Sequence, residues 1–288
     1  MKFIPVFYTE KMSANSYDDV SPSAHKPKAL IEHWLQKGIY PIEIIEPKPA
    51  LLEELCLAHD PVYVNNVLNL IVDNGFHNKS EDVAVSLPYT SGSMLSAARH
   101  VLVHGGVACS PTSGFHHAHY KSGHGFCTFN GLMVTALTLK KEGKVEKVGI
   151  MDCDYHYADG TVDIIKHFNI DWVIHYCRGS GYKPYAPVFI DKIKRLMASF
   201  AECDIILYQA GADAHHNDPL GGFLNNKQMS ERDRVVFQEA KKMNIPLVWN
   251  LAGGYQVDID TDGKQDISKI LTLHSNTLQE CINVYVDH

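Results

Sequence analysis

Lys147-Val148-Gly149-Ile150-Met151-Asp152-Cys153-Asp154-Tyr155-His156 joins an apolar run to two carboxylates and an imidazole. The apolar half predicts a buried strand, and the polar residues follow at its expected end. Because side chains alternate between the two faces of a strand, Asp152, Asp154 and His156 are expected to point the same way. Such a cluster is costly to bury unless a cation or a shared proton compensates its charge. Carboxylate and imidazole ligands at this spacing suit a divalent metal, zinc above all.

A single D-x-H pattern is common by chance, and on its own it favours an ordinary polar turn over a metal site. The metal hypothesis therefore needs partners elsewhere in the chain. Three other stretches supply candidates, and each follows an apolar run like the one before Asp152. In a sheet of parallel strands the carboxyl ends share one edge, and functional sites are expected there.

Strand-like apolar runs alternate with helical patterns along the chain. The strand-like runs cover 2–7, 106–109, 148–151, 172–176, 205–208 and 246–251. The helical patterns cover 30–35, ended by Gly38; 61–71, capped by Asp60 and closed by Gly75; and 132–139, 162–168 and 232–243. This alternation predicts a single α/β domain over residues 1–288, with a mostly parallel central sheet flanked by helices on both faces.

Composition narrows the classes of function. The 288 residues are 45% hydrophobic, enough for one large core, and the formal net charge is −7 with no Lys/Arg block, which argues against a nucleic-acid partner. No run of 18 apolar residues is present, so no membrane span is expected, and the first residues read as a strand rather than a signal peptide. Seven scattered cysteines, none in C-x-x-C, favour a reducing compartment, and we expect a cytoplasmic protein. Composition leaves the oligomeric state open.

Two adjacent histidines, His116 and His117, lie in a glycine-rich, aromatic-flanked segment at 113–118. Histidine changes charge near neutral pH, so such a pair can transfer protons. It needs carboxylates behind it to fix the tautomers, and Asp152 and Asp159 are the candidates. The alternative is a solvated histidine-rich loop, which the segment taken alone slightly favours.

Two further strand ends carry candidate residues. Asp213 closes Gln209-Ala210-Gly211-Ala212-Asp213 and is either a third metal ligand or a helix N-cap. With Asp154 and His156 it would leave a coordination position open, as catalytic zinc requires. Tyr255 follows Gly253-Gly254 and either offers its hydroxyl to a developing oxyanion or packs in an ordinary turn.

Three other residues near these segments are not expected to take part in the chemistry. His215 and His216 follow Asp213 and are expected to be exposed at the mouth of the site. Cys153 lies between the two aspartates and should face the opposite way, into the core.

Five ordered motifs make the chain resemble the histone deacetylase superfamily from about Ala24 to Tyr255. They are G-F-H-H-A at 114–118, G-F-C-x-F-N at 125–130, D-x-D-x-H-x-x-D-G-T at 152–161, Q-A-G-A-D at 209–213 and G-G-Y at 253–255. Each motif is weak alone, but the ordered set is specific. The resemblance implies an arginase-like α/β fold and a zinc-dependent deacetylase.

The resemblance also implies a role for each matching residue. One zinc ion would be held by Asp154, His156 and Asp213. His117, backed by Asp159, would be the general base and acid. His116, backed by Asp152, would be an electrostatic or acid partner.

For the substrate, the resemblance implies that Tyr255 hydrogen-bonds the acyl carbonyl. Phe126, next to Gly125, would form one wall of a narrow channel for a lysine stem, and Gly254 would lie at its floor. The second aromatic wall would be Tyr182 or Tyr185.

The chain departs from the family pattern at two places. Relatives hold a structural potassium ion with a serine of the strand after D-x-D-x-H, whereas this strand reads Val173-Ile174-His175-Tyr176-Cys177. Polyamine-specific members carry a glutamate where this chain has Leu220, which favours a lysine substrate over an acetylated polyamine.

The resemblance implies zinc-dependent removal of an acyl group, in the first place acetyl, from Nε-acyl-lysine in a protein or peptide. One rival is the deacetylation of polyamines or other small acylated amines. A rival of another class is a non-catalytic zinc-holding module that binds acyl-lysine or a small ligand. A dinuclear manganese ureohydrolase of the related fold would need further metal ligands, which the 152–156 segment lacks.

Overall fold

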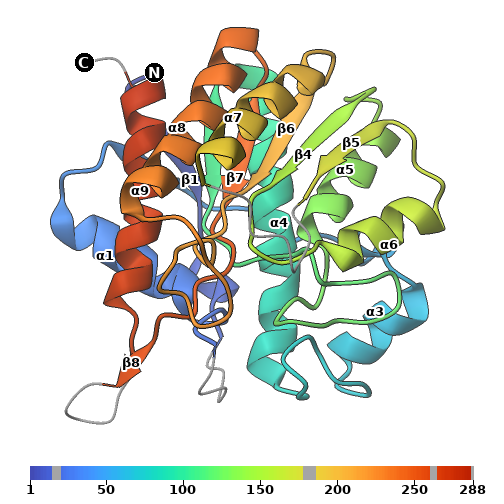
Figure 1. The fold of residues 1–288 in the computed structure, drawn as a ribbon. Coiled ribbons are helices and arrows are strands. Elements are labelled where there is room, and N and C mark those ends of the chain that lie inside the picture. The colour runs from blue at the N-terminus through green and yellow to red at the C-terminus, as the bar shows by residue number, and fades with distance from the viewer. Residues whose placement is uncertain (15–20, 178–185, 260–264, 287–288) are drawn as a thin grey trace.

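A seven-stranded parallel sheet forms the centre of the computed structural model, which describes residues 1–14, 21–177, 186–259 and 265–286 (Figure 1). The strand order is β2-β1-β3-β7-β6-β4-β5, and every pair of neighbours is parallel. The strands are β1 (Ile4–Phe7), β2 (Ile42–Ile45), β3 (Val107–Ser110), β4 (Val148–Asp152), β5 (Val173–Tyr176), β6 (Ile205–Gln209) and β7 (Leu247–Asn250). A separate antiparallel pair joins β8 (Asp258–Ile259) and β9 (Gln265–Asp266).

Helices cover both faces of the sheet, and each face has its own buried apolar cluster (Figure 1). One face carries α1 (Lys26–Lys37), α7 (Ala186–Met197), α8 (Asn226–Met243) and α9 (Ser268–Tyr285). The other carries α2 (Leu52–Ala58), α3 (Pro61–Leu68), α4 (Glu81–His104), α5 (Gly131–Lys141) and α6 (Asp159–His167). The predicted α/β fold with a parallel sheet between helices is therefore confirmed.

Strand β4 shows how the pleat divides the residues of the opening segment. Ile150 belongs to the cluster under α2–α6, whereas Met151 and Cys153 belong to the cluster on the opposite face, as predicted for Cys153. The strand ends at Asp152. Asp154 and His156 therefore lie in the following loop, where strand alternation does not apply. The three side chains nevertheless converge as expected, because Asp152 and Asp154 both contact His116 and Asp154 contacts His156.

The helix predicted to continue to Ile71, before Gly75, ends earlier than expected. Asp60 caps α3 as expected, because its carboxylate accepts from the N–H groups of Val62 and Tyr63. The helix stops at Leu68, and Leu70 has a φ of 61°, a left-handed value that no α-helix can continue through.

Helix α4 was not predicted, because its sequence contains Pro88 and a run of small polar residues. The small residues serve close packing. A Cβ on Gly92 would lie 2.2 Å from the Lys48 carbonyl oxygen, and Ser93 Oγ donates to the carbonyl of Phe7 on β1. Tertiary packing thus outweighs the poor helix propensity of this segment.

The order of the strands brings the candidate residues to one edge of the sheet. Strands β3, β7, β6 and β4 are neighbours, and the segments that follow them are 111–117, 251–255, 210–213 and 153–158. All four leave the carboxyl edge, where parallel sheets place their sites. Among the described residues, no helix is both long and apolar enough to cross a membrane.

Candidate active site

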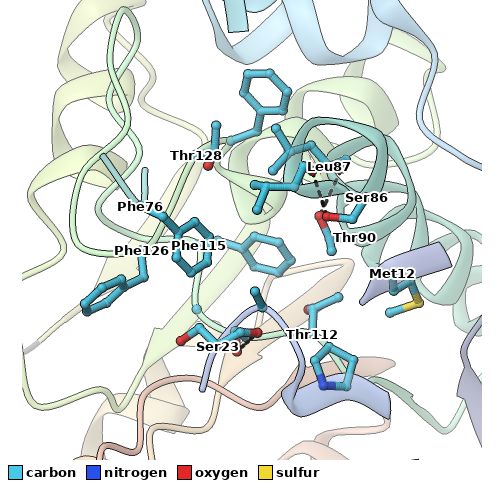
Figure 2. Close-up of a pocket in the computed structure, with 16 residues that line it drawn as sticks. Met12, Ser23, Phe76, Ser86, Leu87, Thr90, Thr112, Phe115, Phe126 and Thr128 are labelled. Carbon is cyan, nitrogen blue, oxygen red and sulfur yellow. Dashed lines mark hydrogen bonds between the residues drawn. The ribbon is translucent and has the colours of Figure 1, made fainter. Parts of the chain in front are cut away.

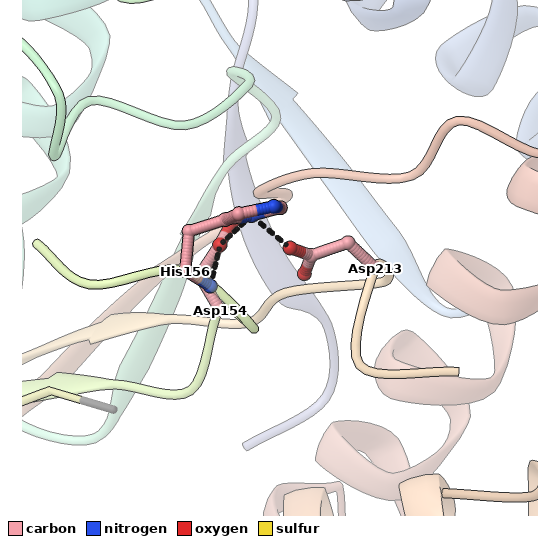
Figure 3. A group of neighbouring side chains, drawn as sticks. All are labelled: Asp154, His156 and Asp213. Carbon is pink, nitrogen blue, oxygen red and sulfur yellow. Dashed lines mark hydrogen bonds and ion pairs between the residues drawn. The ribbon is translucent and has the colours of Figure 1, made fainter. Parts of the chain in front are cut away.

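Asp154, His156 and Asp213 form the one group of potential metal ligands found among the described residues (Figure 3). Their ligand atoms all lie within 4.8 Å of one another. His156 Nδ1 is 3.1 Å from Asp154 Oδ1 and 2.9 Å from Asp213 Oδ2. In a tetrahedral site with zinc–ligand bonds of about 2.0–2.2 Å, ligand atoms lie about 3.3–3.6 Å apart, so small shifts of these side chains would complete the site. The donor set and its spacing therefore fit zinc.

The orientation of His156 is set by a backbone carbonyl. Its Nε2 lies 3.1 Å from the carbonyl oxygen of Leu220, which only accepts hydrogen bonds, so Nε2 carries a proton. Nδ1 then faces the two carboxylates and is the nitrogen available to a metal. The Leu220 side chain is exposed, and the contact with the site comes from its backbone.

Without a cation, the buried carboxylates of the triad favour bound protons. Burial and the charge of Asp154 raise the pKa of Asp213 to about 8. Burial opposes the charged form of His156, but its hydrogen bonds with both aspartates outweigh burial and raise its pKa to about 11. A divalent cation would displace these protons, as metals do when they bind ionisable ligands.

His116 forms a fully buried pair with Asp152. Its Nδ1 is 2.8 Å from Asp152 Oδ2, and the same oxygen accepts from the side-chain amide of Gln209 at 3.2 Å. Burial alone would keep His116 neutral, but the charges of Asp152 and Asp154 outweigh it and raise the pKa of His116 to about 9. The structure thus brings together the first predicted His–Asp pair and favours a protonated imidazole there.

His117 pairs with Asp159 and has the opposite electrostatic balance. Its Nδ1 is 2.6 Å from Asp159 Oδ1. Burial and the neighbouring His116 lower the pKa of His117 below 6.5, against the opposing effect of Asp159. At neutral pH His117 is therefore the imidazole that can accept a proton.

Gly125 lets the loop approach the ring of His117. A Cβ at this position would lie 2.6 Å from His117 Cδ2, and the φ of Gly125 is 51°. The next residue, Phe126, has a φ of 62°, which is strained for a bulky side chain. The centroid of its ring lies 5.8 Å from that of Tyr255, and the two ring planes are tilted by 41°, so the rings contact each other beside the site.

Tyr255 follows two glycines that let the chain turn tightly against the segment after β6 and against α9. A Cβ on Gly253 would lie 2.7 Å from the carboxyl carbon of Asp213, and one on Gly254 would lie 2.9 Å from Ile270. Burial and the nearby charge of Asp154 hold the pKa of Tyr255 well above 10, so its hydroxyl stays a donor. A cavity of about 10 Å³ lies between these groups and is lined by Ser23, Gly114, His116, His117, Gly125, Phe126, Cys127, Asp154, Gly253 and Tyr255.

A second cavity of about 50 Å³ lies beside the first, against α4 (Figure 2). Its lining is mostly apolar and includes Met12, Leu87 and Phe115. Ser23, Gly114 and Phe126 line both cavities and therefore form the wall between them.

Several residues of the site had no signal in the sequence. Lys26 is fully buried, and its Nζ donates to the Gly253 carbonyl at 2.5 Å. Burial lowers the pKa of Lys26 to about 7 against the charges of Asp154, Asp213 and Asp218. Asp218 accepts from the Tyr255 and Leu220 N–H groups and so ties these two loops together. A lysine at a helix start and an aspartate in a loop are common, so only the fold reveals their positions.

Exposure was predicted for both His215 and His216, and it is confirmed for one of them. His216 is exposed, but His215 is buried, where its Nδ1 accepts from the Asn217 N–H and lies 3.2 Å from the Gln256 amide. Exposure was therefore the wrong expectation for His215, which fixes the loop after Asp213. Tyr182 and Tyr185, the candidates for the second channel wall, lie outside the described residues.

Comparison with known proteins adds independent evidence. An uncharacterized protein of Picosynechococcus is 25% identical over 274 residues, covering 83% of this chain and 89% of that protein. Histone deacetylase 2 of Arabidopsis thaliana is 25% identical over 246 residues, covering 74% of this chain and 63% of that protein. The crystal structure of the HDA15 HD domain superposes with a TM-score of 0.78 at 18% identity, covering 100% of this chain and 91% of that one, and so shows the fold.

The family model of the histone deacetylase domain matches residues 22–171 and 166–271. These matches include all the segments that form the carboxyl-edge site. They agree with the ordered motifs and with the parallel sheet that brings those motifs together. We conclude that this chain belongs to the histone deacetylase family, and is a hydrolase of the deacetylase type.

Proposed function

We propose that the protein removes an acyl group, in the first place acetyl, from the Nε atom of an acyl-lysine in a protein or peptide. Asp154, His156 and Asp213 would hold one zinc ion for this reaction. The observation that carries the proposal is the arrangement of this triad beside two His–Asp pairs, His116 with Asp152 and His117 with Asp159. When bound, zinc supplies Lewis acidity at the amide carbonyl and lowers the pKa of water at the site.

The proton transfers would be carried out by the two histidines, and Tyr255 would stabilise the oxyanion. Neutral His117 accepts a proton from the attacking water, and Asp159 holds the imidazole in place. The water oxygen bonds to the acyl carbon, and the Tyr255 hydroxyl donates to the oxyanion that develops. The carbon–nitrogen bond then breaks as a protonated histidine, His117 or His116, delivers a proton to the leaving amine. The products are a carboxylate and a free amine.

The proposed substrate is suggested by an apolar residue beside the site. Phe126 lines the cavity that holds His117 and Tyr255, so its ring would pack against the methylene groups of a lysine stem and leave the polar backbone end in water.

A substrate panel tests the proposal against its rivals. Zinc-loaded protein should hydrolyse acetyl-lysine peptides faster than acetylputrescine or acetylspermidine, and chelation should abolish the activity. Faster turnover of the acetylpolyamines would instead assign the small-amine reaction. Absence of hydrolysis on the entire panel, with zinc bound, would assign a non-catalytic binding module.

The dependence of kcat/KM on pH should report His117. The base must be unprotonated, so kcat/KM should rise with pH through a midpoint below 6.5, because burial and His116 lower the pKa of His117. Asp159 opposes this shift, so Asp159→Asn should move the midpoint to still lower pH and reduce kcat about 10–100-fold. A midpoint that moves to higher pH in Asp159→Asn would contradict the assigned base.

Acyl size should be restricted by the wall between the two cavities. The cavity of about 10 Å³ between His117 and Tyr255, here called the inner cavity, holds about one water-sized group. It therefore suits an acetyl methyl group but not a longer acyl chain. We expect butyryl-lysine to react roughly tenfold slower than acetyl-lysine. Phe126→Ala should join the cavities and raise the butyryl-to-acetyl ratio of kcat/KM. An unchanged ratio would show that this wall does not limit the acyl group.

Two further expectations stay predictions: the single domain spanning 1–288 and the cytoplasmic location. The notion of a structural potassium ion, which relatives hold near the strand that corresponds to β5, stays open. The described strand β5 contains no serine whose hydroxyl could bind potassium.

A further inference from the structure

His119, two residues after the proposed base, shares the carboxylate of Asp159 with it. Asp159 Oδ1 is 2.6 Å from His117 Nδ1, and Asp159 Oδ2 is 3.3 Å from His119 Nε2. The Asp159 side chain is 44% exposed, so water also reaches it. Among the described residues, His119 contacts Asp159 Oδ2, whereas the Gly160 N–H donates to Oδ1. One carboxylate thus bridges two imidazoles, each from the same loop.

The backbone of His119 is fixed from the core. Its N–H donates to the Ser122 carbonyl at 2.8 Å, and its carbonyl accepts from Nδ1 of His59 at 2.9 Å. His59 is fully buried, and its Nε2 accepts from the Asn130 N–H, so the proton must be on Nδ1. Burial lowers the pKa of His59 to about 4, so this donor stays neutral and keeps its tautomer. His119 is therefore a rigid neighbour of Asp159.

A second carboxylate faces the other side of the His119 ring. Asp163 Oδ2 is 3.6 Å from His119 Nδ1, and the same oxygen accepts from the Tyr120 N–H at 2.9 Å. In either neutral tautomer, one ring N–H therefore faces a carboxylate. The ring lies between Asp159 and Asp163, both on α6, and the contact with Asp159 is the shorter of the two.

We propose that His119 is a positioning residue for His117, the proposed base, and that it acts through Asp159. The kinetic consequence of this inference rests on the proposed function. By occupying Oδ2, it limits rotation of the half-exposed carboxylate and keeps Oδ1 on Nδ1 of His117. His117 then presents Nε2 to the substrate in one tautomer and one orientation. Loss of the contact leaves Oδ2 to water and loosens the ring of the base.

Three variants test the proposal by steady-state kinetics on the zinc-loaded protein. His119→Leu should lower kcat about 3–10-fold, which is at or below the smallest loss usually seen when a hydrogen-bonding partner of a catalytic residue is removed. KM should stay within about twofold of the wild-type value, and the zinc content should not change. His119→Gln keeps an N–H donor and should restore most of kcat. His124→Leu is the matched control, because His124 packs against His119 with ring centroids 5.6 Å apart and makes no ion pair with Asp159. Equal kcat in His119→Leu and wild type would overturn the proposal.

A double-mutant cycle separates this role from general support of the loop. Because His119 acts through Asp159, His119→Leu should have no further effect on kcat in the Asp159→Asn background. The same fold-loss in both backgrounds would show that His119 only stabilises the loop, and would also overturn the proposal.

A readout without turnover keeps this inference distinct from the proposed function. The His117 Nδ1–H proton, hydrogen-bonded to Asp159, should give a downfield proton NMR signal that disappears in His117→Asn. In zinc-loaded His119→Leu this signal should exchange faster with solvent, and in His119→Gln it should be retained. An unchanged exchange rate in His119→Leu contradicts the positioning role, whether or not any amide is hydrolysed.

Discussion

Replacing Asp213 with alanine should remove both the bound zinc and the turnover, whereas His117→Ala should remove only the turnover. Asp213 is fully buried, and its Oδ2 lies 2.9 Å from Nδ1 of His156, so it supplies one of three proposed ligands. Its loss should weaken zinc binding by more than roughly 100-fold, beyond the effect of losing a supporting partner. His117 contributes no ligand, and its loss should lower kcat about 10²–10⁴-fold. Metal analysis and kcat on the same preparations would measure both effects.

A conservative variant guards against simple unfolding. Asp213 Oδ1 and Oδ2 both accept from the Tyr155 N–H, so Asp213→Ala also removes a loop contact. Asp213→Asn keeps the size and an acceptor oxygen but removes the charge, and it should still lose zinc. Equal zinc contents in Asp213→Asn and His117→Ala, with both folded by circular dichroism, would contradict the ligand assignment.

Tyr255→Phe should lower kcat about 10²–10³-fold with little change in KM, the range expected when one oxyanion donor is removed. The tyrosine lines the inner cavity with His116, His117 and Asp154, and its raised pKa keeps the hydroxyl protonated at working pH. The variant removes one oxygen and leaves the ring that packs beside Phe126. Initial rates on an acetyl-lysine peptide across a range of concentrations would separate kcat from KM.

Tyr63→Phe is the matched control for this variant. Tyr63 is also buried, and its hydroxyl donates to the Thr128 carbonyl at 2.9 Å, away from the inner cavity. Its replacement should change stability but not kcat. Similar losses of kcat in both variants would mean that Tyr255 acts by supporting the fold rather than by donating to the oxyanion.

The sequence located the candidate residues because the sheet is parallel and its strands are short apolar runs. Asp152, Asp213 and Tyr255 could be placed at one edge, since each follows such a run and carboxyl ends converge. The details of the loops could not be derived in this way. His156 reaches Asp154 and Asp213 after the strand has ended, and its orientation depends on the carbonyl of Leu220, 64 residues away.

The sequence failed where tertiary contacts override local preference. The small residues and Pro88 of α4 disfavour a helix, yet close packing against 48–50 and β1 stabilises one. Lys26 has no local signal either, since a charged residue at the start of α1 is normally solvated. Its burial beside Gly253 follows from the way α1 packs next to the carboxyl edge.

Diffraction from zinc-loaded crystals, measured on both sides of the zinc absorption edge, tests the central claim most directly. We predict one strong anomalous peak, about 2.0–2.2 Å from Asp154, from Nδ1 of His156 and from Asp213. A peak bound elsewhere, or none at this triad in crystals that contain stoichiometric zinc, would contradict the proposed metal centre.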